Sequence, residues 1–184
     1  MRKINLRALT SIAMLTALSV VFTRIFVLVN TDTLRLTIGN VPIMLCGIFF
    51  GPVAGGICGV LSDFLGCILF GGYMPYLPMT LSLLVIGVLP GIAAKLVKRR
   101  SNMSIANPVV LCATVFVTEL IASFFWKTMC LSWMYSSPFF ALFYERLLVN
   151  VIQSVLEVAL LFLLLKSGVL VKLFSSDRSE KNGQ

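Results

Sequence analysis

The sequence predicts an all-α integral membrane protein, a bundle of six transmembrane helices with both termini in the cytoplasm. Of its 184 residues, 59% are hydrophobic and 12% are charged, whereas about a quarter of the residues in an ordinary soluble domain are charged. Several apolar runs approach or exceed the roughly 20 residues that a helix needs to cross the hydrocarbon core. We expect one membrane domain over residues 1–174 and a polar tail over residues 175–184.

The first two predicted spans differ in length. The first covers residues 8–29, and its apolar run at residues 12–29 is too long for the core of a typical signal peptide. After a polar connection, the second covers residues 41–50 and reaches only about 15 Å at 1.5 Å per residue. It ends at Gly51-Pro52, a turn signal. The remaining spans are predicted at residues 53–70, 77–97, 108–126 and 147–171.

Three clusters of basic residues decide whether the short second run crosses the membrane. Lysine and arginine near the ends of transmembrane helices concentrate on the cytoplasmic side. All three clusters fall on that side if six segments cross, and five crossings would place one cluster outside. The clusters are Arg2, Lys3 and Arg7; Lys95, Lys98, Arg99 and Arg100; and Lys172, Arg178 and Lys181.

With this topology, nearly all polar side chains at intramembrane or boundary positions lie in the outer half of the bundle. Such groups usually face a bundle interior or a water-filled cavity, where they pair. We interpret them as an outward-facing substrate pocket; the alternative is a set of structural ion pairs. The candidate substrate-binding residues are Arg24, Asn40, Asp63, Tyr73, Trp126, Lys127, Arg146 and Asn150.

This mixture of side chains suits a planar, nitrogen-rich ring with an anionic tail. Asp63 could accept two N–H bonds from an amino-heterocycle, while arginine or lysine could bind terminal carboxylates. Aromatic side chains could stack on the ring, although a belt of aromatic residues at the membrane interface also explains Tyr73 and Trp126. Glu119 and Glu157 lie deeper in their spans, where packing partners are expected.

The sequence lacks the motifs of several other functions. It contains no phosphate-binding G-x-x-x-x-G-K-[ST] loop and no G-x-S-x-G motif. It has no histidine, and its five cysteines form no C-x-x-C pair, so we expect neither a metal site nor a cofactor. The net charge of +8 is concentrated in the predicted cytoplasmic flanks, so nucleic-acid binding is not needed to explain it. We therefore expect a non-catalytic protein.

The order of several short motifs resembles the substrate-binding S component of energy-coupling factor (ECF) transporters, and within that group the folate family. The resemblance covers about residues 24–91 and extends more loosely to Trp126-Lys127 and Arg146. The motifs are Asn40-Val41-Pro42-Ile43, Gly51-Pro52, Gly55, Gly59, Ser62-Asp63, Gly66, Gly72-Tyr73-x-Pro75 and Thr80-Leu81-Ser82.

This resemblance implies a multi-pass subunit of the bacterial cell membrane, surrounded by membrane lipid, that binds folate from the outer face. ATP hydrolysis would belong to its partners, a transmembrane coupling subunit (EcfT type) and two ABC ATPase subunits. Ala13 and Ala17 form a small-residue pair on one face of the first helix, the expected docking face for the coupling subunit. Gly55 and Gly59 are expected to form a similar face.

Two alternatives remain open at this stage. The chain is an S component for another vitamin or heterocyclic solute, since pocket residues vary freely on one scaffold. Otherwise it is a stand-alone carrier of small solutes, although no inverted repeat is evident in the sequence.

Overall fold

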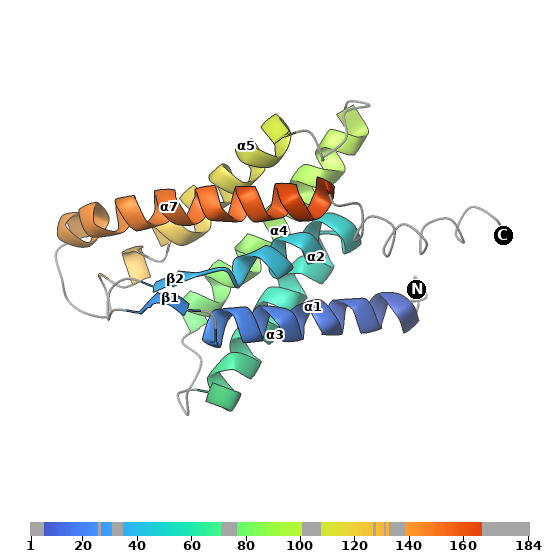
Figure 1. The fold of residues 1–184 in the computed structure, drawn as a ribbon, viewed down its shortest axis with the longest axis horizontal. Helices are drawn as coiled ribbons and strands as arrows, with labels where there is room; N and C mark the ends of the chain where they lie inside the picture. The colour runs from blue at the N-terminus through green and yellow to red at the C-terminus, as the bar shows by residue number, and fades with distance from the viewer. Residues whose placement is uncertain are drawn as a thin grey trace.

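The computed structural model describes residues 6–25, 27–30, 35–70, 77–100, 108–126, 128–130, 132 and 139–166. Helices dominate this part of the chain, and one short β-hairpin accompanies them (Figure 1). The elements, in order, are α1 (Leu6–Arg24), β1 (Val27–Asn30), β2 (Arg35–Thr37), α2 (Asn40–Phe50), α3 (Pro52–Phe70), α4 (Leu77–Arg100), α5 (Pro108–Thr118), the π-helix η1 (Glu119–Trp126) and α7 (Phe139–Lys166).

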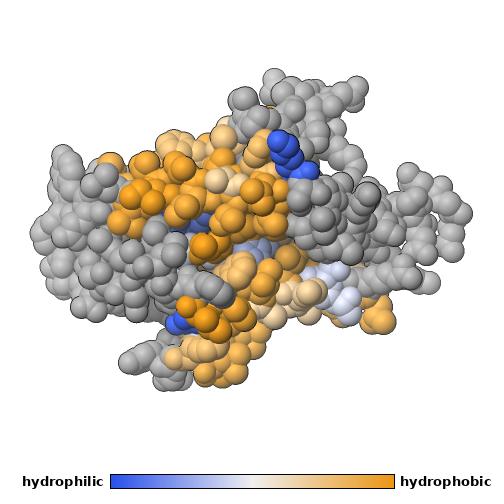
Figure 2. Space-filling view, viewed as in Figure 1, coloured by the Kyte–Doolittle hydropathy of each residue, from blue (hydrophilic) through white to orange (hydrophobic). Residues whose placement is uncertain are grey.

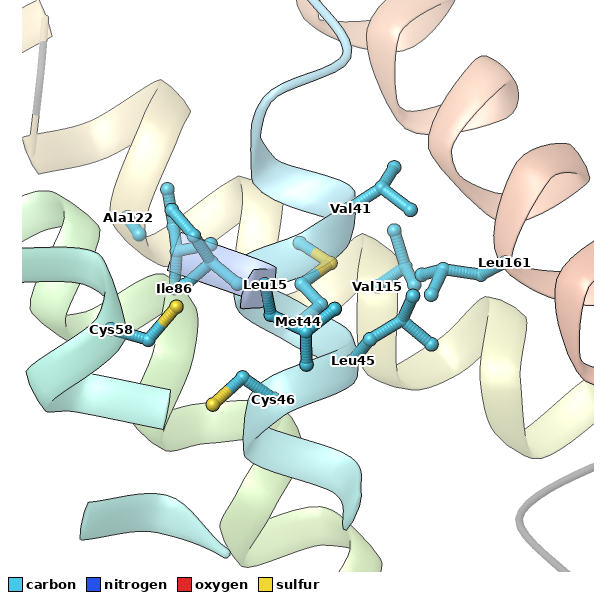
Figure 3. Packing of buried hydrophobic residues seen from close by; sticks show 11 residues of the cluster. Leu15, Val41, Met44, Leu45, Cys46, Cys58, Ile86, Val115, Ala122 and Leu161 are labelled. Atoms are coloured by element: carbon cyan, nitrogen blue, oxygen red, sulfur yellow. The ribbon is translucent and has the colours of Figure 1, made fainter. Parts of the chain in front are cut away.

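Helix α2 is the centre of the bundle. All eight residues from Asn40 to Gly47 are buried, which is expected for a helix that is apolar on every side. Helices α1, α3, α4 and α7 all contact it. Figure 3 shows Val41, Met44 and Leu45 of α2 surrounded by side chains from the other helices. The short second span of the sequence is thus the core element around which the longer helices pack.

The predicted break after α2 is confirmed. Gly51 has φ 99°, a left-handed conformation that glycine adopts without the steric cost a Cβ would add. Pro52 follows as the first residue of α3, where its missing N–H costs no helical hydrogen bond. The chain therefore reverses within two residues, and α3 returns along α2.

Glycines bring the backbones of α2, α3 and α4 into direct contact. A Cβ on Gly55 would overlap the carbonyl oxygen of Gly87, and a Cβ on Gly87 would overlap the carbonyl oxygen of Gly55. On Gly91, a Cβ would lie 2.6 Å from the backbone nitrogen of Pro52. Small residues that let helices approach this closely are characteristic of membrane bundles. The glycine pattern therefore holds three helices of one chain together.

This packing corrects the prediction that Gly55 and Gly59 form a docking face for a partner subunit. Both residues are buried, and a Cβ on Gly59 would overlap the carbonyl oxygen of Leu83 in α4. Helix α4 already occupies the face that these glycines present, so another chain has no access to them. By contrast, Ala13 and Ala17 are exposed on α1.

The predicted end of the first span is also wrong. Helix α1 ends at Arg24 rather than near residue 29, and Val27–Asn30 forms a strand that pairs antiparallel with Arg35–Thr37. A cation in the last turn interacts favourably with the negative end of the helix dipole. The β-branched valines that follow fit an extended strand better than a helix. Within the described residues, this hairpin is the only element of regular structure that is not helical.

Of the last two helical regions, the first matches its predicted bounds and the second does not. Helix α5 continues without interruption into η1, and together they cover the predicted residues 108–126. Helix α7 starts at Phe139 instead of residue 147 and has 28 residues. At 1.5 Å per residue this is about 42 Å, more than the roughly 30 Å of a hydrocarbon core. Residues 167–171 and the predicted tail lie outside the described part of the chain.

The described surface is suited to a lipid environment. Helix α3 and residues Leu77–Val97 of α4 are long and apolar enough to cross a membrane, and shorter apolar segments lie in the other helices. Large hydrophobic side chains are exposed along α3, including Val53 at 73% and Leu69 at 67%. Hydrophobic residues cover most of the described part of the face in Figure 2. The start of α1 and the end of α7 lie at one end of the bundle, and the hairpin lies at the other (Figure 1).

Replacement of Gly55 or Gly87 by alanine should lower thermal stability. Helix propensity alone favours alanine by about 1 kcal/mol, but the added methyl group would overlap backbone atoms, and overpacking costs about 1–3 kcal/mol. At about 2–4 °C per kcal/mol for a chain of this size, we expect the unfolding midpoint in detergent to fall by several degrees. Ala113→Val on the exposed side of α5 is the control. Unchanged midpoints for both glycine variants would contradict the close packing.

Candidate functional site

A cluster of buried polar side chains lies where the start of α2 meets η1 and α7. The amide Nδ2 of Asn40 donates to Oε1 of Glu119 at 3.2 Å and to Oε1 of Glu157 at 2.9 Å. Gln153 Nε2 also donates to Oε1 of Glu157, at 3.0 Å. The exposed fraction of each of these four side chains is 6% or less. Three segments far apart in the sequence are therefore joined through two carboxyl groups.

Only one oxygen of each carboxyl group in this cluster accepts a hydrogen bond from the described part of the chain. Oε2 of Glu119 and Oε2 of Glu157 are buried and have no hydrogen-bond partner in the described part of the chain, and neither does Nδ2 of Asn150. No described lysine or arginine forms an ion pair with either glutamate. A buried polar atom without a partner costs free energy, and buried charges are normally paired. The cluster has the unsatisfied hydrogen-bonding capacity expected of a ligand site.

A cavity of about 200 Å³ lies beside the cluster, between α5–η1 and α7. Apolar side chains that are also exposed on the outside of the bundle form its wall, and the buried polar atoms of Glu119 and Asn150 lie behind them. An apolar cavity with a few convergent polar groups is the usual form of a small-molecule site. The lining residues are Phe116, Glu119, Leu120, Leu147, Asn150, Val151 and Ser154.

Local structure explains why these side chains converge. Asn150, Gln153 and Glu157 are spaced by three and four residues in α7, which places them on one face of the helix. Glu119 is the first residue of η1, and the wider turn of a π-helix changes the direction of the side chains that follow; such segments are frequent at functional sites. Asn40 is positioned by Gly39, whose carbonyl oxygen accepts the Ser19 hydroxyl at 2.8 Å.

Arg24 and Asp63 belong to a second polar network, between α1, α3 and α4. Nη2 of Arg24 lies 3.3 Å from Sγ of Cys67, which lies 4.0 Å from Oδ1 of Asp63. The other oxygen of Asp63 accepts the Thr80 hydroxyl at 2.7 Å. The Arg24 guanidinium lies against Gly66, where a Cβ would be 2.9 Å from Nε. This network connects three helices, and none of its members lines the cavity.

The structure therefore separates the residues that were predicted to share one pocket. Asn40 and Asn150 belong to the cluster beside the cavity, whereas Arg24 and Asp63 belong to the second network. Trp126 is 41% exposed and donates its indole N–H to the carbonyl oxygen of Pro78 at 2.7 Å. Tyr73, Lys127 and the side chain of Arg146 lie outside the described part of the chain, so their predicted roles stay predictions.

Sequence reasoning missed the central members of the cluster. Glu119 and Glu157 were expected to be packing partners, and Gln153 was not singled out. The available signal was the i, i+4 pair of Gln153 and Glu157 inside an otherwise apolar helix, since polar residues at such depth are usually functional. The convergence of this pair with Glu119 depends on the π-helix, which has no comparable signature in the sequence.

Comparisons with known proteins name two different substrates. Over 94 residues the chain is 37% identical to the "Folate transporter FolT" of Clostridium novyi (strain NT), an alignment that covers 50% of this chain and 52% of that protein. The chain thus matches about half the length of this curated relative. Its fold matches the crystal structure of FolT bound with folic acid with a TM-score of 0.73 and 24% identity, covering 86% of this chain and 92% of that chain.

The family assignment itself comes from a match along nearly the whole chain. Residues 3–169 match the model of the family described as "ECF-type riboflavin transporter, S component". The matched region includes all the described helices and both polar networks. The chain therefore belongs to the family of S components of ECF-type riboflavin transporters.

Proposed function

We propose that this protein is the vitamin-binding subunit of an ECF-type ABC importer and that its substrate is folate. The family supports the role of S component, and both the curated relative and the matched structure are folate proteins. Riboflavin is the second candidate substrate because the family model carries that name. A stand-alone carrier is disfavoured by membership of a family of transporter S components.

The observation that carries this proposal is the cavity beside Glu119 and Asn150. Behind its apolar wall lie a buried carboxylate oxygen of Glu119 and the amide Nδ2 of Asn150, which no described protein group satisfies. A ligand with N–H donors and carbonyl acceptors would satisfy both at once, and would recover the free energy lost by burying them unpaired. The apolar wall supplied by Phe116, Leu120 and Val151 suits the faces of an aromatic ring.

The size of the cavity indicates which part of the vitamin it holds. Pockets for whole drug-sized ligands measure about 300–1,000 Å³, whereas a cavity of about 150 Å³ is enough for benzene. At about 200 Å³, the cavity has room for a ring system rather than for a complete folate. We therefore place the ring of the substrate between η1 and α7.

Arg24 and Asp63 have a different role in this proposal. Cys67 lies between the Arg24 and Asp63 side chains, and Asp63 also accepts a hydrogen bond from Thr80. These contacts connect α1 to α3 and α4. An arginine in the bilayer is costly unless it finds polar partners, and this network supplies them. We propose that the pair holds the helices in register and that substrate contacts are made at the cavity.

The remaining features of the importer are proposed from the family and from the ends of the helices. Six crossings with both termini in the cytoplasm place Lys95 and Lys166 on the inner side. The protein itself would be non-catalytic, and two ABC ATPase subunits would act through a coupling subunit. Ala13 and Ala17 are the proposed contact for that subunit because they are exposed on one face of α1 and permit close helix approach.

Purified protein in detergent is expected to bind one folate per chain, as measured by isothermal titration calorimetry or native mass spectrometry. Proteoliposomes that contain this chain alone should show no ATP-driven folate uptake, and addition of the coupling and ATPase subunits should restore it. Preferential binding of riboflavin would select the second candidate substrate. Folate uptake by the chain alone would establish a carrier instead.

Arg24→Ala should mainly lower the unfolding midpoint, whereas Asn150→Ala should mainly weaken folate binding. Loss of Arg24 removes a contact between α1 and α3, so we expect a lower unfolding midpoint with folate affinity changed less than about threefold. Loss of Asn150 removes a cavity donor that has no protein partner, so we expect at least about tenfold weaker binding, equivalent to about 1.4 kcal/mol, at an unchanged midpoint.

Affinity titrations and thermal scans of both variants distinguish these roles. If Arg24→Ala weakens folate binding by tenfold or more at an unchanged midpoint, Arg24 is a substrate ligand, as the sequence predicted, and the structural role is wrong.

Ala17→Leu should leave folate binding unchanged and reduce uptake by the reconstituted importer. The added side chain projects from an exposed face of α1 and would block only the approach of another helix. Ala113→Leu on an exposed face of α5 is the matched control and should retain uptake. Equal loss of uptake in both variants, or loss of folate binding in Ala17→Leu, would refute the docking assignment.

A further inference from the structure

We propose that the Glu119 and Glu157 side chains hold one proton between their unpartnered oxygens, and that this proton joins η1 to α7 inside the bundle. The site takes a hydrogen ion rather than a metal ion or an organic ligand. This inference does not depend on the proposed function, because the contacts that carry it lie within the protein and involve no substrate.

The first step of the argument is the distance between the two carboxyl groups. They lie within hydrogen-bonding range of each other, and one nitrogen contacts both. Asn40 Nδ2 donates to Oε1 of Glu119 at 3.2 Å and to Oε1 of Glu157 at 2.9 Å. Two carboxylates that share a site in this way repel each other, and the interior of a protein screens the repulsion poorly.

The second step is the burial of the pair. The exposed fraction is 3% for Glu119 and 1% for Glu157, so both carboxyl groups are shielded from solvent. Helices α2 and α7 place the neutral amides of Asn40 and Gln153 against them. Two uncompensated negative charges at such a position would be costly, whereas a bound proton removes one of them.

The third step is the position of the other charged groups. The side chains of Arg35 on β2 and Arg146 on α7 lie outside the described part of the chain. The structure describes four further charged side chains, and each has its contacts in another part of the bundle. Arg24 and Asp63 lie at Cys67, Lys95 lies beside Gly51, and Lys166 lies over the Phe162 ring.

The fourth step is the hydrogen bonding of the remaining oxygens. Oε2 of Glu119 and Oε2 of Glu157 are buried without a described partner, and two ionised carboxylates cannot bond to each other because both only accept. One added proton turns one oxygen into a donor and gives both a partner. Oε1 of Glu157 already accepts from Asn40 and Gln153, as a carbonyl oxygen with two lone pairs can. The hydrogen is therefore assigned to Oε2 of Glu157.

This assignment leaves Glu119 ionised. A carboxylate has about four lone-pair sites, and the bonds from Asn40 and from the Glu157 hydroxyl occupy two of them. The cluster keeps one negative charge and can still accept hydrogen bonds, so the proton is compatible with the proposed substrate site.

The proton makes the stability of the protein depend on pH. In an unfolded chain both glutamates are ionised at neutral pH, so the folded protein binds one proton more than the unfolded one. Stability therefore decreases as the pH rises, until the folded pair has lost its proton as well. Within that range the unfolding equilibrium constant should increase by up to about tenfold per pH unit.

Infrared spectroscopy of the purified protein in detergent, without folate, tests for the proton directly. A protonated carboxyl group has a C=O stretching band that is separate from the carboxylate bands and shifts on exchange into D₂O. We expect this band at neutral pH in wild-type protein and in the control Asp63→Asn. It should be absent in Glu157→Gln and in Glu119→Gln, where the new amide donates in place of the proton. Absence of the band in wild-type protein, or its persistence in either glutamine variant, would overturn the inference.

Thermal unfolding over a pH series gives a second readout. The midpoint of wild-type protein should fall more steeply with rising pH than that of Glu157→Gln, because the variant has no shared proton to lose. Glu119→Gln should show the same shallow dependence and replaces Glu157→Gln if that variant does not fold. Equal slopes in all three proteins, or a wild-type midpoint that depends on Na⁺ concentration instead of pH, would refute the proton site. Neither experiment uses folate, so its failure would leave the proposed function intact.

Discussion

The hydrogen bonds from the Asn40 amide to Glu119 and Glu157 are the interaction on which the arrangement of the site depends. One nitrogen joins the start of α2 to both η1 and α7, and it fixes one oxygen of each carboxyl group while the other oxygen has no described partner. Two carboxyl groups with no described cation beside them would be a poor way to stabilise a bundle, because buried charges cost free energy unless they are compensated. The cluster makes better physical sense as a site that a bound molecule completes.

The rest of the fold supplies the rigid surroundings that such a site needs. Helix α2 is buried along Asn40–Gly47, and the glycines of α2, α3 and α4 hold three helices at backbone contact. The Arg24–Cys67–Asp63–Thr80 network fastens α1 to the same group. On the other side, α5, η1 and α7 approach α2 less closely, and the cavity lies between them. The molecule thus has a tightly packed half and a half that leaves space for a ligand.

Much of the fold was predictable because apolar length, turn residues and basic flanks depend on local sequence. The Gly51-Pro52 break and the long spans at α3 and α4 follow from these signals. The β1–β2 hairpin was missed because Val27 and Val29 are as apolar as the helix before them, so hydropathy could not separate strand from helix. For the candidate site, the sequence predicts Asn40 and Asn150, which lie at the cluster, but assigns Glu119 and Glu157 to packing because their convergence depends on the π-helix and on tertiary contacts.

The most direct test of the central claim is the infrared difference spectrum of the carboxyl and carboxylate stretching bands on addition of folate. If a buried glutamate receives the ring of the substrate, folate should shift a carboxylate band in wild-type protein and in Asp63→Asn, and this shift should be absent in Glu119→Gln. Unchanged carboxylate bands in wild-type protein that binds folate, or a shift that persists in Glu119→Gln and disappears in Asp63→Asn, would contradict the account.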